Sequence, residues 1–119
     1  MFRESIQKVV EGSPGALAGV LMGFDGIAVD GFSQPGGAID IGDVAMELSH
    51  VYKQIRSAAG QLEVGVLNEV TFAADNMTVV ARLLNDEFFV AVALAPGGNT
   101  GKARYLLRVA APAIRAELL

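Results

Sequence analysis

Residues 16–32 read ALAGVLMGFDGIAVDGF, and this stretch decides the fold class. Residues 16–23 are apolar at nearly every position, which is typical of a strand buried on both faces. The Asp25-Gly26 dipeptide that follows is a strong signal for a tight turn. Residues 27–32 predict a second strand before a QPGG segment ends the pattern. We therefore expect this stretch to form a β-hairpin.

Residues 40–59 are the longest stretch with helical periodicity, and Gly60 is expected to cap the C-terminus of this helix. Apolar residues recur along it at alternating spacings of three and four, as in a helix that packs along a second helix. Ala45, Tyr52 and Ala59 widen this stripe. The residues of the stripe itself are Ile41, Val44, Leu48, Val51 and Ile55.

Residues 62–72 alternate between apolar and polar side chains, with Asn68 as the one polar residue on the apolar face. This alternation predicts a strand with one solvated face. A long unpaired edge strand invites association, and pairing with a second copy of the same strand is a symmetric way to cover it. The apolar positions are Leu62, Val64, Val66, Val70 and Phe72.

The remaining segments complete an α-β-β-α-β-β-β-α order. A short amphipathic helix is predicted before Gly12, and strands are predicted over residues 77–84 and 88–95. The last of these is apolar on both faces, so we expect it in the centre of the sheet. No repeat or linker interrupts the chain, and we expect a single domain spanning residues 1–119.

The segment PGGNTGK at 96–102 connects the last strand to a final helix, which Asn99 or Thr100 is expected to cap. It superficially resembles a phosphate-binding loop. However, proline replaces the first glycine and Ala103 replaces the hydroxyl residue that would bind magnesium, so a structural connection is predicted. The helix is expected to kink or end at Pro112, because an interior proline costs about 3 kcal/mol.

The composition excludes several classes of function. The net charge is −4, and no run of Lys or Arg forms the basic patch of a nucleic-acid binder. Cysteine is absent, which excludes disulfides and thiolate metal sites. Neither a signal peptide nor an apolar run of roughly 20 residues is present, so a cytoplasmic location is expected. The 52% apolar content suggests surface covered by a partner, with amyloid-like edge exposure or Ala and Gly richness as the alternative sources.

No arrangement of residues predicts catalysis, a metal site or a cofactor. His50 is the only histidine, and we expect a solvated residue on a helix face, with an interface contact as the alternative. No serine lies in a nucleophile-elbow context. Arg82 is expected to pair with Glu69 or Glu87, and a finger-like cation is the alternative. We therefore expect a binding protein and not an enzyme.

The element order, the hairpin GFDGIAVD at 23–30 and the run GNTGKAR at 98–104 resemble the roadblock family. This family includes the dynein light chain roadblock proteins and bacterial relatives of the MglB type. The resemblance implies a roadblock/profilin-like α/β (α+β) fold: a five-stranded antiparallel sheet with the long second helix on one face and the terminal helices on the other. It also implies a homodimer in which the third strands pair edge to edge and the second helices lie side by side. The interface positions expected on this basis are Ile41, Val44, Leu48, Val51, Ile55, Val64, Val66 and Val70.

The resemblance also implies a function, because family members regulate or scaffold Ras-like small GTPases. The bacterial members resemble activating proteins that insert no arginine finger, so the paired helices would rearrange the GTPase's own catalytic residues. The alternative is a non-enzymatic adaptor that leaves nucleotide turnover unchanged. A third reading is a profilin-like small-molecule sensor, although no polar groups placed to line a pocket are evident. The GTPase contact candidates are Glu47, His50, Tyr52, Lys53, Gln54 and Arg56.

Overall fold

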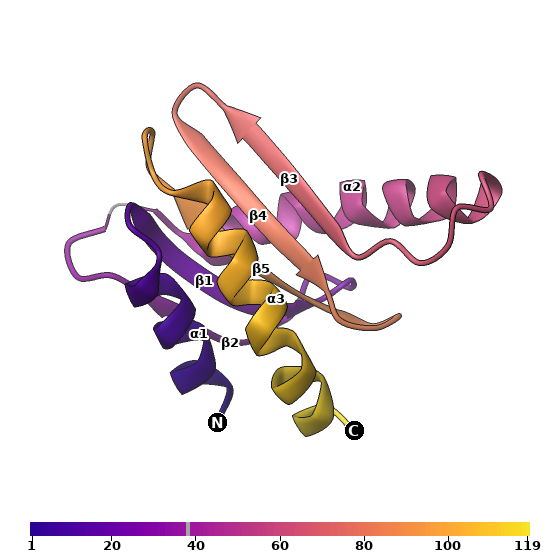
Figure 1. The fold of residues 1–119 in the computed structure, drawn as a ribbon, viewed down its shortest axis with the longest axis horizontal. Coiled ribbons are helices and arrows are strands. Elements are labelled where there is room, and N and C mark those ends of the chain that lie inside the picture. Colours follow the sequence, from indigo (N-terminus) through magenta and orange to yellow (C-terminus); the bar gives the residue numbers. More distant parts are fainter. Residues whose placement is uncertain (38) are drawn as a thin grey trace.

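A five-stranded antiparallel sheet with helices on both faces is the framework of the chain (Figure 1). The computed structural model describes residues 1–37 and 39–119. The strand order is β2-β1-β5-β4-β3, so β2 and β3 form the two edges. The predicted fold class and element order are confirmed. The elements are α1 (Phe2–Gly12), β1 (Ala16–Gly23), β2 (Ala28–Ser33), α2 (Ile41–Gln61), β3 (Glu69–Ala74), β4 (Met77–Leu83), β5 (Phe88–Leu94) and α3 (Thr100–Glu117).

The predicted hairpin is formed by β1 and β2. Its turn depends on Gly26, whose φ of 87° is reached without strain only by glycine. The N–H of Gly26 donates to the carbonyl oxygen of Gly23 at 2.9 Å, and the Asp25 carboxylate accepts from the N–H of Ile27 at 3.0 Å. β1 also pairs with β5 on its other side, which explains why its sequence is apolar throughout.

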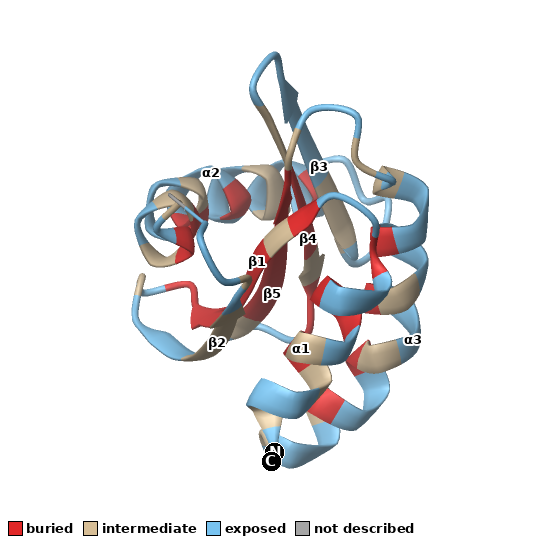
Figure 2. Cartoon of the chain, turned by 90° about the vertical axis from the view of Figure 1, so that its left-hand side faces the viewer, coloured by how far each residue is buried: buried red, intermediate tan, exposed pale blue. Residues whose placement is uncertain are grey.

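The terminal helices cover one face of the sheet. Their apolar stripes pack against alternate side chains of β1, β4 and β5, and Figure 2 shows the buried residues concentrated on the strands between the helix layers. α1 ends at Gly12 as predicted. The most deeply buried residues on this face include Ile6, Val10, Leu21, Val80, Val90 and Leu107.

The opposite face is covered by α2 alone. An aromatic cluster anchors the helix: the Phe89 ring lies 5.1 Å from Tyr52 and 5.2 Å from Phe24, measured between ring centroids. α2 packs mainly over β1 and β5, the strands nearest the β2 edge. Its C-terminal half extends away from the body of the molecule, together with the connection to β3 (Figure 1). The β3 side of this face is therefore less fully covered.

The end of α2 differs from the prediction. The helix continues to Gln61 and includes Gly60, which was expected to be the cap. The N–H of Glu63 donates to the Gly60 carbonyl at 3.2 Å, and the N–H of Val64 donates to the Ala59 carbonyl at 3.4 Å. This pair of bonds is a Schellman motif, and Glu63 occupies its left-handed position with a φ of 55°. The prediction was wrong because a non-glycine residue takes the conformation that usually selects glycine.

The third strand is shorter than predicted. The sequence alternation spans residues 62–72, but β3 begins only at Glu69. The positive φ angles of Glu63 (55°) and Gly65 (95°) turn the chain away from an extended path, so residues 62–68 form a connection without strand pairing along most of their length. The alternation of apolar and polar residues does not reveal this turn, because an irregular segment can have the same alternation.

The final helix is capped as predicted but does not break. The Asn99 side chain accepts from the backbone N–H of Lys102 at 3.0 Å. α3 then continues through Pro112 to Glu117, so the helix does not end at the proline. Pro112 is exposed, so the Arg108 carbonyl that loses its helical donor lies on the solvent side, where water can bind it.

Candidate protein-binding surface

One side of α2 carries apolar side chains that the core covers only in part. Val44 and Leu48 pack against the edge of the core, Ile55 is half-buried, and Val51 is 43% exposed. Ile41 was expected on the same surface, but it is only 7% exposed and belongs to the core. The accessible stripe therefore begins at Val44.

Tyr52 fixes the rotation of α2 and does not face solvent. The prediction that it lies on the solvent-facing side is wrong, because its side chain is fully buried and packs edge-on against Phe89. Ala45, on the same side of the helix, is also fully buried. Burial raises the pKa of the Tyr52 hydroxyl, which has no hydrogen-bond partner in the described part of the chain. With Tyr52 facing the sheet, the stripe from Val44 to Ile55 lies along one flank of α2, between its buried side and solvent.

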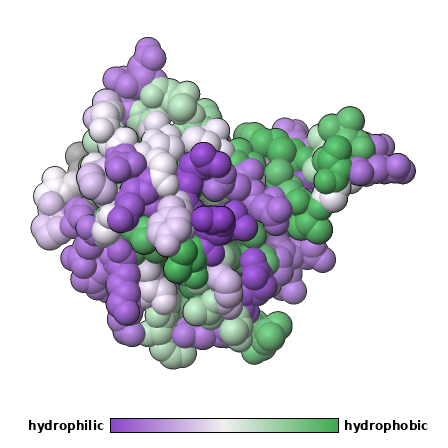
Figure 3. Space-filling view, viewed as in Figure 1, coloured by the Kyte–Doolittle hydropathy of each residue, from purple (hydrophilic) through white to green (hydrophobic). Residues whose placement is uncertain are grey.

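The connection between α2 and β3 continues this apolar surface. Val64 is 72% exposed and Val66 is 85% exposed, so neither side chain is covered by the chain's own fold. Leu62, at the end of α2, is exposed in the same way. In Figure 3 apolar side chains gather on the arm that projects from the body, where α2 ends and the connection begins. Exposed apolar surface of this kind marks an interaction site.

The edge strand β3 contributes both side chains and backbone groups. Val70 and Phe72 lie opposite Ala81 and Val79, which belong to the core under α2, so both point to the α2 face. Phe72 is 46% exposed. Together these residues form what we call the apolar band. Its members are Val44, Leu48, Val51, Ile55, Leu62, Val64, Val66, Val70 and Phe72.

The backbone of β3 presents free hydrogen-bonding groups at the sheet edge. The N–H of Leu83 donates to the Asn68 carbonyl at 2.9 Å, which sets the phase of the ladder between β3 and β4. Because alternate residues of an antiparallel strand point their backbone groups to opposite sides, Glu69, Thr71 and Ala73 direct theirs away from β4. A strand of another chain can pair with these groups.

The expected GTPase contacts lie beside the band, with two exceptions. Tyr52 is in the core, as described above. Arg56 is half-buried, and its guanidinium is held within the chain: Nη1 donates to the Asp86 carbonyl at 2.9 Å, and the group lies 4.2 Å from the centroid of the Phe24 ring. The remaining candidates, all exposed on α2, are Glu47, His50, Lys53 and Gln54.

The predicted partner of Arg82 is also wrong. Glu69 lies directly opposite Arg82 in the strand register, but its Oε2 accepts from the Nε of Arg104 on α3 at 2.8 Å and lies 2.7 Å from Nη2 of the same arginine. The hydrogen bond with Glu69 raises the pKa of the Arg104 guanidinium. Strand pairing considered alone could not reveal this contact, because the competing arginine comes from a helix packed over the sheet.

Neither a metal-ligand group nor a membrane-spanning helix is found in the part of the chain that the structure describes. Among residues 1–37 and 39–119, no group of three or more His, Cys, Asp or Glu residues is arranged to hold a metal ion. None of the helices there is both long and apolar enough to cross a membrane. What the geometry does provide is apolar area and free strand edge, which are the means of binding another protein.

Two members of the band were not among the interface positions predicted from the sequence. Leu62 and Phe72 both belong to the apolar positions of the alternation, and both are exposed. Their place in the same alternation as Val64, Val66 and Val70 was the signal that could have found them.

The arrangement defines an α/β protein of the roadblock type, with a sheet between one long helix and two terminal helices. Among solved structures, MglC from Myxococcus xanthus is 40% identical over 98% of both chains, with a TM-score of 0.72. A Roadblock/LC7 domain from Streptomyces avermitilis is 19% identical over 97% of this chain and 95% of that one, with a TM-score of 0.82. The chain therefore belongs to the roadblock family, as its sequence resemblance indicated.

Another protein from Myxococcus xanthus, MglB, is much less similar to this chain in sequence than MglC is. MglB from Myxococcus xanthus is only 10% identical over 98% of this chain and 89% of that one, with a TM-score of 0.77, which shows a shared fold alone. No protein-family model and no curated protein sequence matches the chain. Within the family, the sequence is thus far nearer to MglC than to MglB.

Proposed function

We propose that this chain is a homodimeric protein-binding module that regulates a Ras-like small GTPase by binding it. The observation that carries the proposal is the free edge of β3 beside the apolar band, since one symmetric contact would cover both. Antiparallel pairing of two β3 edges would join two sheets into one and bring the α2 stripes together. The proposed module is the single domain of residues 1–119, acting in the cytoplasm.

The proposed GTPase contact lies on the polar side of the paired α2 helices, at Glu47, His50, Lys53 and Gln54. Arg56 is engaged with Asp86 and Phe24, which supports binding without insertion of an arginine into the nucleotide site. Any effect on hydrolysis would then act through the GTPase's own catalytic residues. No residue of this chain is proposed to take part in bond breaking.

A second candidate, an adaptor that leaves nucleotide turnover unchanged, is favoured by one observation. The chain is 40% identical to MglC but only 10% identical to MglB from the same bacterium. A chain that is so much nearer to MglC than to MglB need not share the activity of MglB. The adaptor would use the same dimer and the same α2 surface.

Light scattering tests the dimer first. The wild-type chain should have twice the mass of a monomer, and the Val51→Glu variant or the double variant Val66→Lys/Val70→Lys should have the monomer mass, because buried charge opposes the apolar contact. Exposed Val109 on α3 supplies a matched control, since Val109→Glu adds the same charge outside the band. Soluble band variants that keep the dimer mass would contradict the proposed interface.

Affinity capture from the native host's lysate, loaded with a GTP analogue or GDP, then tests the partner. A small GTPase enriched with the GTP analogue, whose hydrolysis accelerates when the purified chain is added, would support the regulator. Binding of that GTPase without any change in turnover would favour the adaptor. Failure of a dimeric preparation to capture any GTPase would overturn GTPase regulation while leaving the dimer intact.

A further inference from the structure

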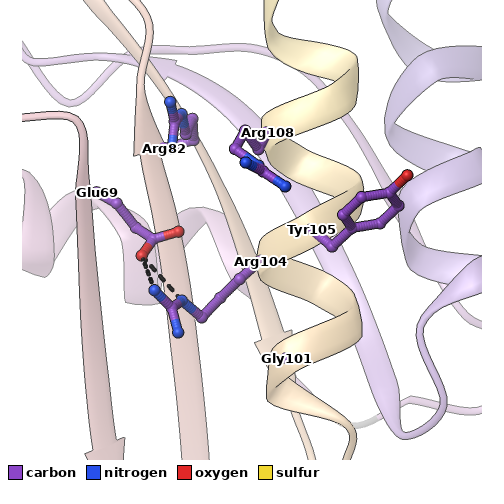
Figure 4. A pocket seen from close by; sticks show the side chains of 6 residues that line it. All are labelled: Glu69, Arg82, Gly101, Arg104, Tyr105 and Arg108. Atoms are coloured by element: carbon purple, nitrogen blue, oxygen red, sulfur yellow. Dashed lines mark hydrogen bonds and ion pairs between the residues drawn. The ribbon is translucent and has the colours of Figure 1, made fainter.

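A pocket on the face opposite α2 concentrates positive charge on a chain that is acidic overall. It has a volume of about 280 Å³ and lies between β3, β4 and the first turns of α3. Three of the nine basic residues of the chain line it, although the net charge is −4. Its lining residues are Glu69, Arg82, Gly101, Arg104, Tyr105 and Arg108 (Figure 4).

One carboxylate already occupies part of this pocket. The Glu69 Oε2 accepts a hydrogen bond from the Arg104 Nε at 2.8 Å and forms an ion pair with Nη2 at 2.7 Å, so one carboxylate oxygen contacts both nitrogens. One arginine of the pocket therefore already binds a carboxylate. Glu69 neutralises only one of the three arginines, which leaves two positive charges facing the pocket.

Arg82 and Arg108 carry these two charges. Figure 4 shows Arg82 on β4 and Arg108 on α3, and the Arg108 guanidinium lies on the Tyr105 side, 5.6 Å from the centroid of that ring. Neither forms an ion pair within residues 1–37 and 39–119, and the Arg82 Nε is buried without a hydrogen-bond partner there. A buried donor without an acceptor is costly, and two guanidinium groups that share one pocket repel each other. An anionic group between them would offset the repulsion.

The surface beside the pocket indicates which kind of anion fits. Tyr105 and Val109 lie one turn apart on α3 and are 51% and 57% exposed. An apolar groove of about 300 Å³ between α1 and α3 continues from Val109, with Leu106 and Ala113 in its lining. A free inorganic anion would leave this apolar surface uncovered. A peptide with acidic and apolar side chains would cover it, whereas the net negative charge of the chain opposes an extended polyanion.

We propose that the arginine pocket binds a carboxylate side chain from an acidic, partly apolar peptide segment of a partner protein. The carboxylate lies between Arg82 and Arg108, and the apolar side chains of the segment lie along Tyr105 and Val109. This site is on the terminal-helix face, so it is separate from the proposed GTPase contact on α2 and remains available when that contact is formed. The chain thus has two independent binding surfaces.

Two measurements on the full chain test the proposal. Fluorescence anisotropy follows a labelled synthetic peptide of glutamates and leucines, with glutamines replacing the glutamates in the control peptide. NMR of the arginine Nε–H groups follows the same peptides and inorganic phosphate. The glutamate peptide is expected to bind and to shift the Arg82 and Arg108 signals, and the glutamine peptide is not.

Three substitutions in the pocket sharpen the test. Arg82→Gln and Arg108→Gln should each weaken binding of the glutamate peptide by roughly tenfold or more, because each removes a charge-assisted hydrogen bond. Arg108 is exposed, so its variant remains informative if Arg82→Gln folds poorly. Glu69→Gln should tighten binding, because it frees Arg104 for the peptide. Arg3→Gln is the matched control, since it removes the same charge from α1 at the β2 edge, where Arg3 contacts Gly31.

Several outcomes would overturn the proposal. An equal loss of binding in Arg3→Gln would show general charge attraction without a specific pocket. Phosphate that shifts the Arg82 signal at lower concentration than the glutamate peptide would identify a phosphate site. Unchanged arginine signals with every probe would show that the pocket binds no anion. Tighter binding of the glutamate peptide by Glu69→Gln, together with weaker binding by Arg108→Gln, would support the proposal.

Discussion

The two faces of the sheet are covered to different extents. On one face, α1 and α3 together seal the side chains of β1, β4 and β5 from solvent. On the other, α2 packs mainly over β1 and β5, and the side toward β3 keeps exposed apolar residues such as Val51 and Phe72. A chain of this size can bury a full core without help. The incomplete face is therefore where we look for a second chain.

Truncating one leucine on each face should show the largest difference. Leu107→Ala, on the sealed face, should lower the free energy of unfolding by about 2–5 kcal/mol, because it leaves a cavity in a core that cannot collapse. Leu48→Ala, on the other face, should lower the free energy of unfolding by a smaller amount at low protein concentration. Its cost should grow with concentration if Leu48 is buried in a dimer. Denaturant unfolding at two protein concentrations measures both, and a concentration-independent cost at Leu48 would contradict the comparison.

Proline substitutions in β3 should separate the dimer from the fold. The Thr71 N–H points to the free edge, so Thr71→Pro leaves the pairing with β4 intact but blocks pairing with another strand. The N–H of Val70 points to β4, so Val70→Pro should unfold the edge or the whole chain. Light scattering should give a folded monomer for Thr71→Pro. A dimer that survives this substitution would exclude β3 pairing and leave only α2 contacts.

Alkaline pH should destabilise the α2 face through Tyr52. Burial raises the pKa of this hydroxyl in the folded chain above its ordinary value of 10.0, so the folded state holds a proton that the unfolded chain releases. Stability is therefore complete below pH 10 and falls above it, by about 1.4 kcal/mol for each pH unit. Tyr52→Phe should remove this slope and also gain about 1 kcal/mol at neutral pH, because no buried hydroxyl then lacks a partner.

Unfolding of both proteins by urea at several pH values measures the slope. If the wild-type chain and the Tyr52→Phe variant lose stability in parallel above pH 10, Tyr52 is not the group responsible.

The smallest effect is expected at the end of α2. Glu63→Gly should raise the free energy of unfolding by about 0.5–1 kcal/mol, because glycine adopts the left-handed conformation of this position without strain. Gly60→Ala is the companion substitution. It should also stabilise the chain, because Gly60 lies inside the helix and an added Cβ has no neighbour within 4 Å. Destabilisation by Gly60→Ala would mean that Gly60 is the cap after all.

Much of the fold could be predicted from the sequence, because local patterns and tertiary packing agree over most of the chain. The uniformly apolar residues 16–23 and the Asp25-Gly26 turn predicted β1 and the hairpin, and both are confirmed. Apart from the helix end expected at Pro112, the failures lie between residues 59 and 69. There Glu63 adopts a left-handed conformation that its side chain does not favour, and no sequence pattern signals it.

The candidate surface was harder to predict than the fold. A stripe at spacings of three and four shows that one side of α2 is apolar, but it does not show where the core ends and the accessible surface begins. Ile41 and Tyr52 proved to be buried for this reason. The pocket arginines were not predicted as a group, because Arg82 meets Arg104 and Arg108 only after α3 packs over β4.

The phase of β3 has a consequence for partner choice. A strand edge made of backbone groups at Glu69, Thr71 and Ala73 can pair with almost any extended segment, so it carries little information about which chain it joins. Discrimination between an identical copy and a sister protein of the same fold must then come from side chains, above all from Val51 on α2 and from Val64 and Val66 in the connection. In a cell that holds several roadblock paralogues, drift at these few positions would be enough to exchange one pairing for another while the edge itself stays the same.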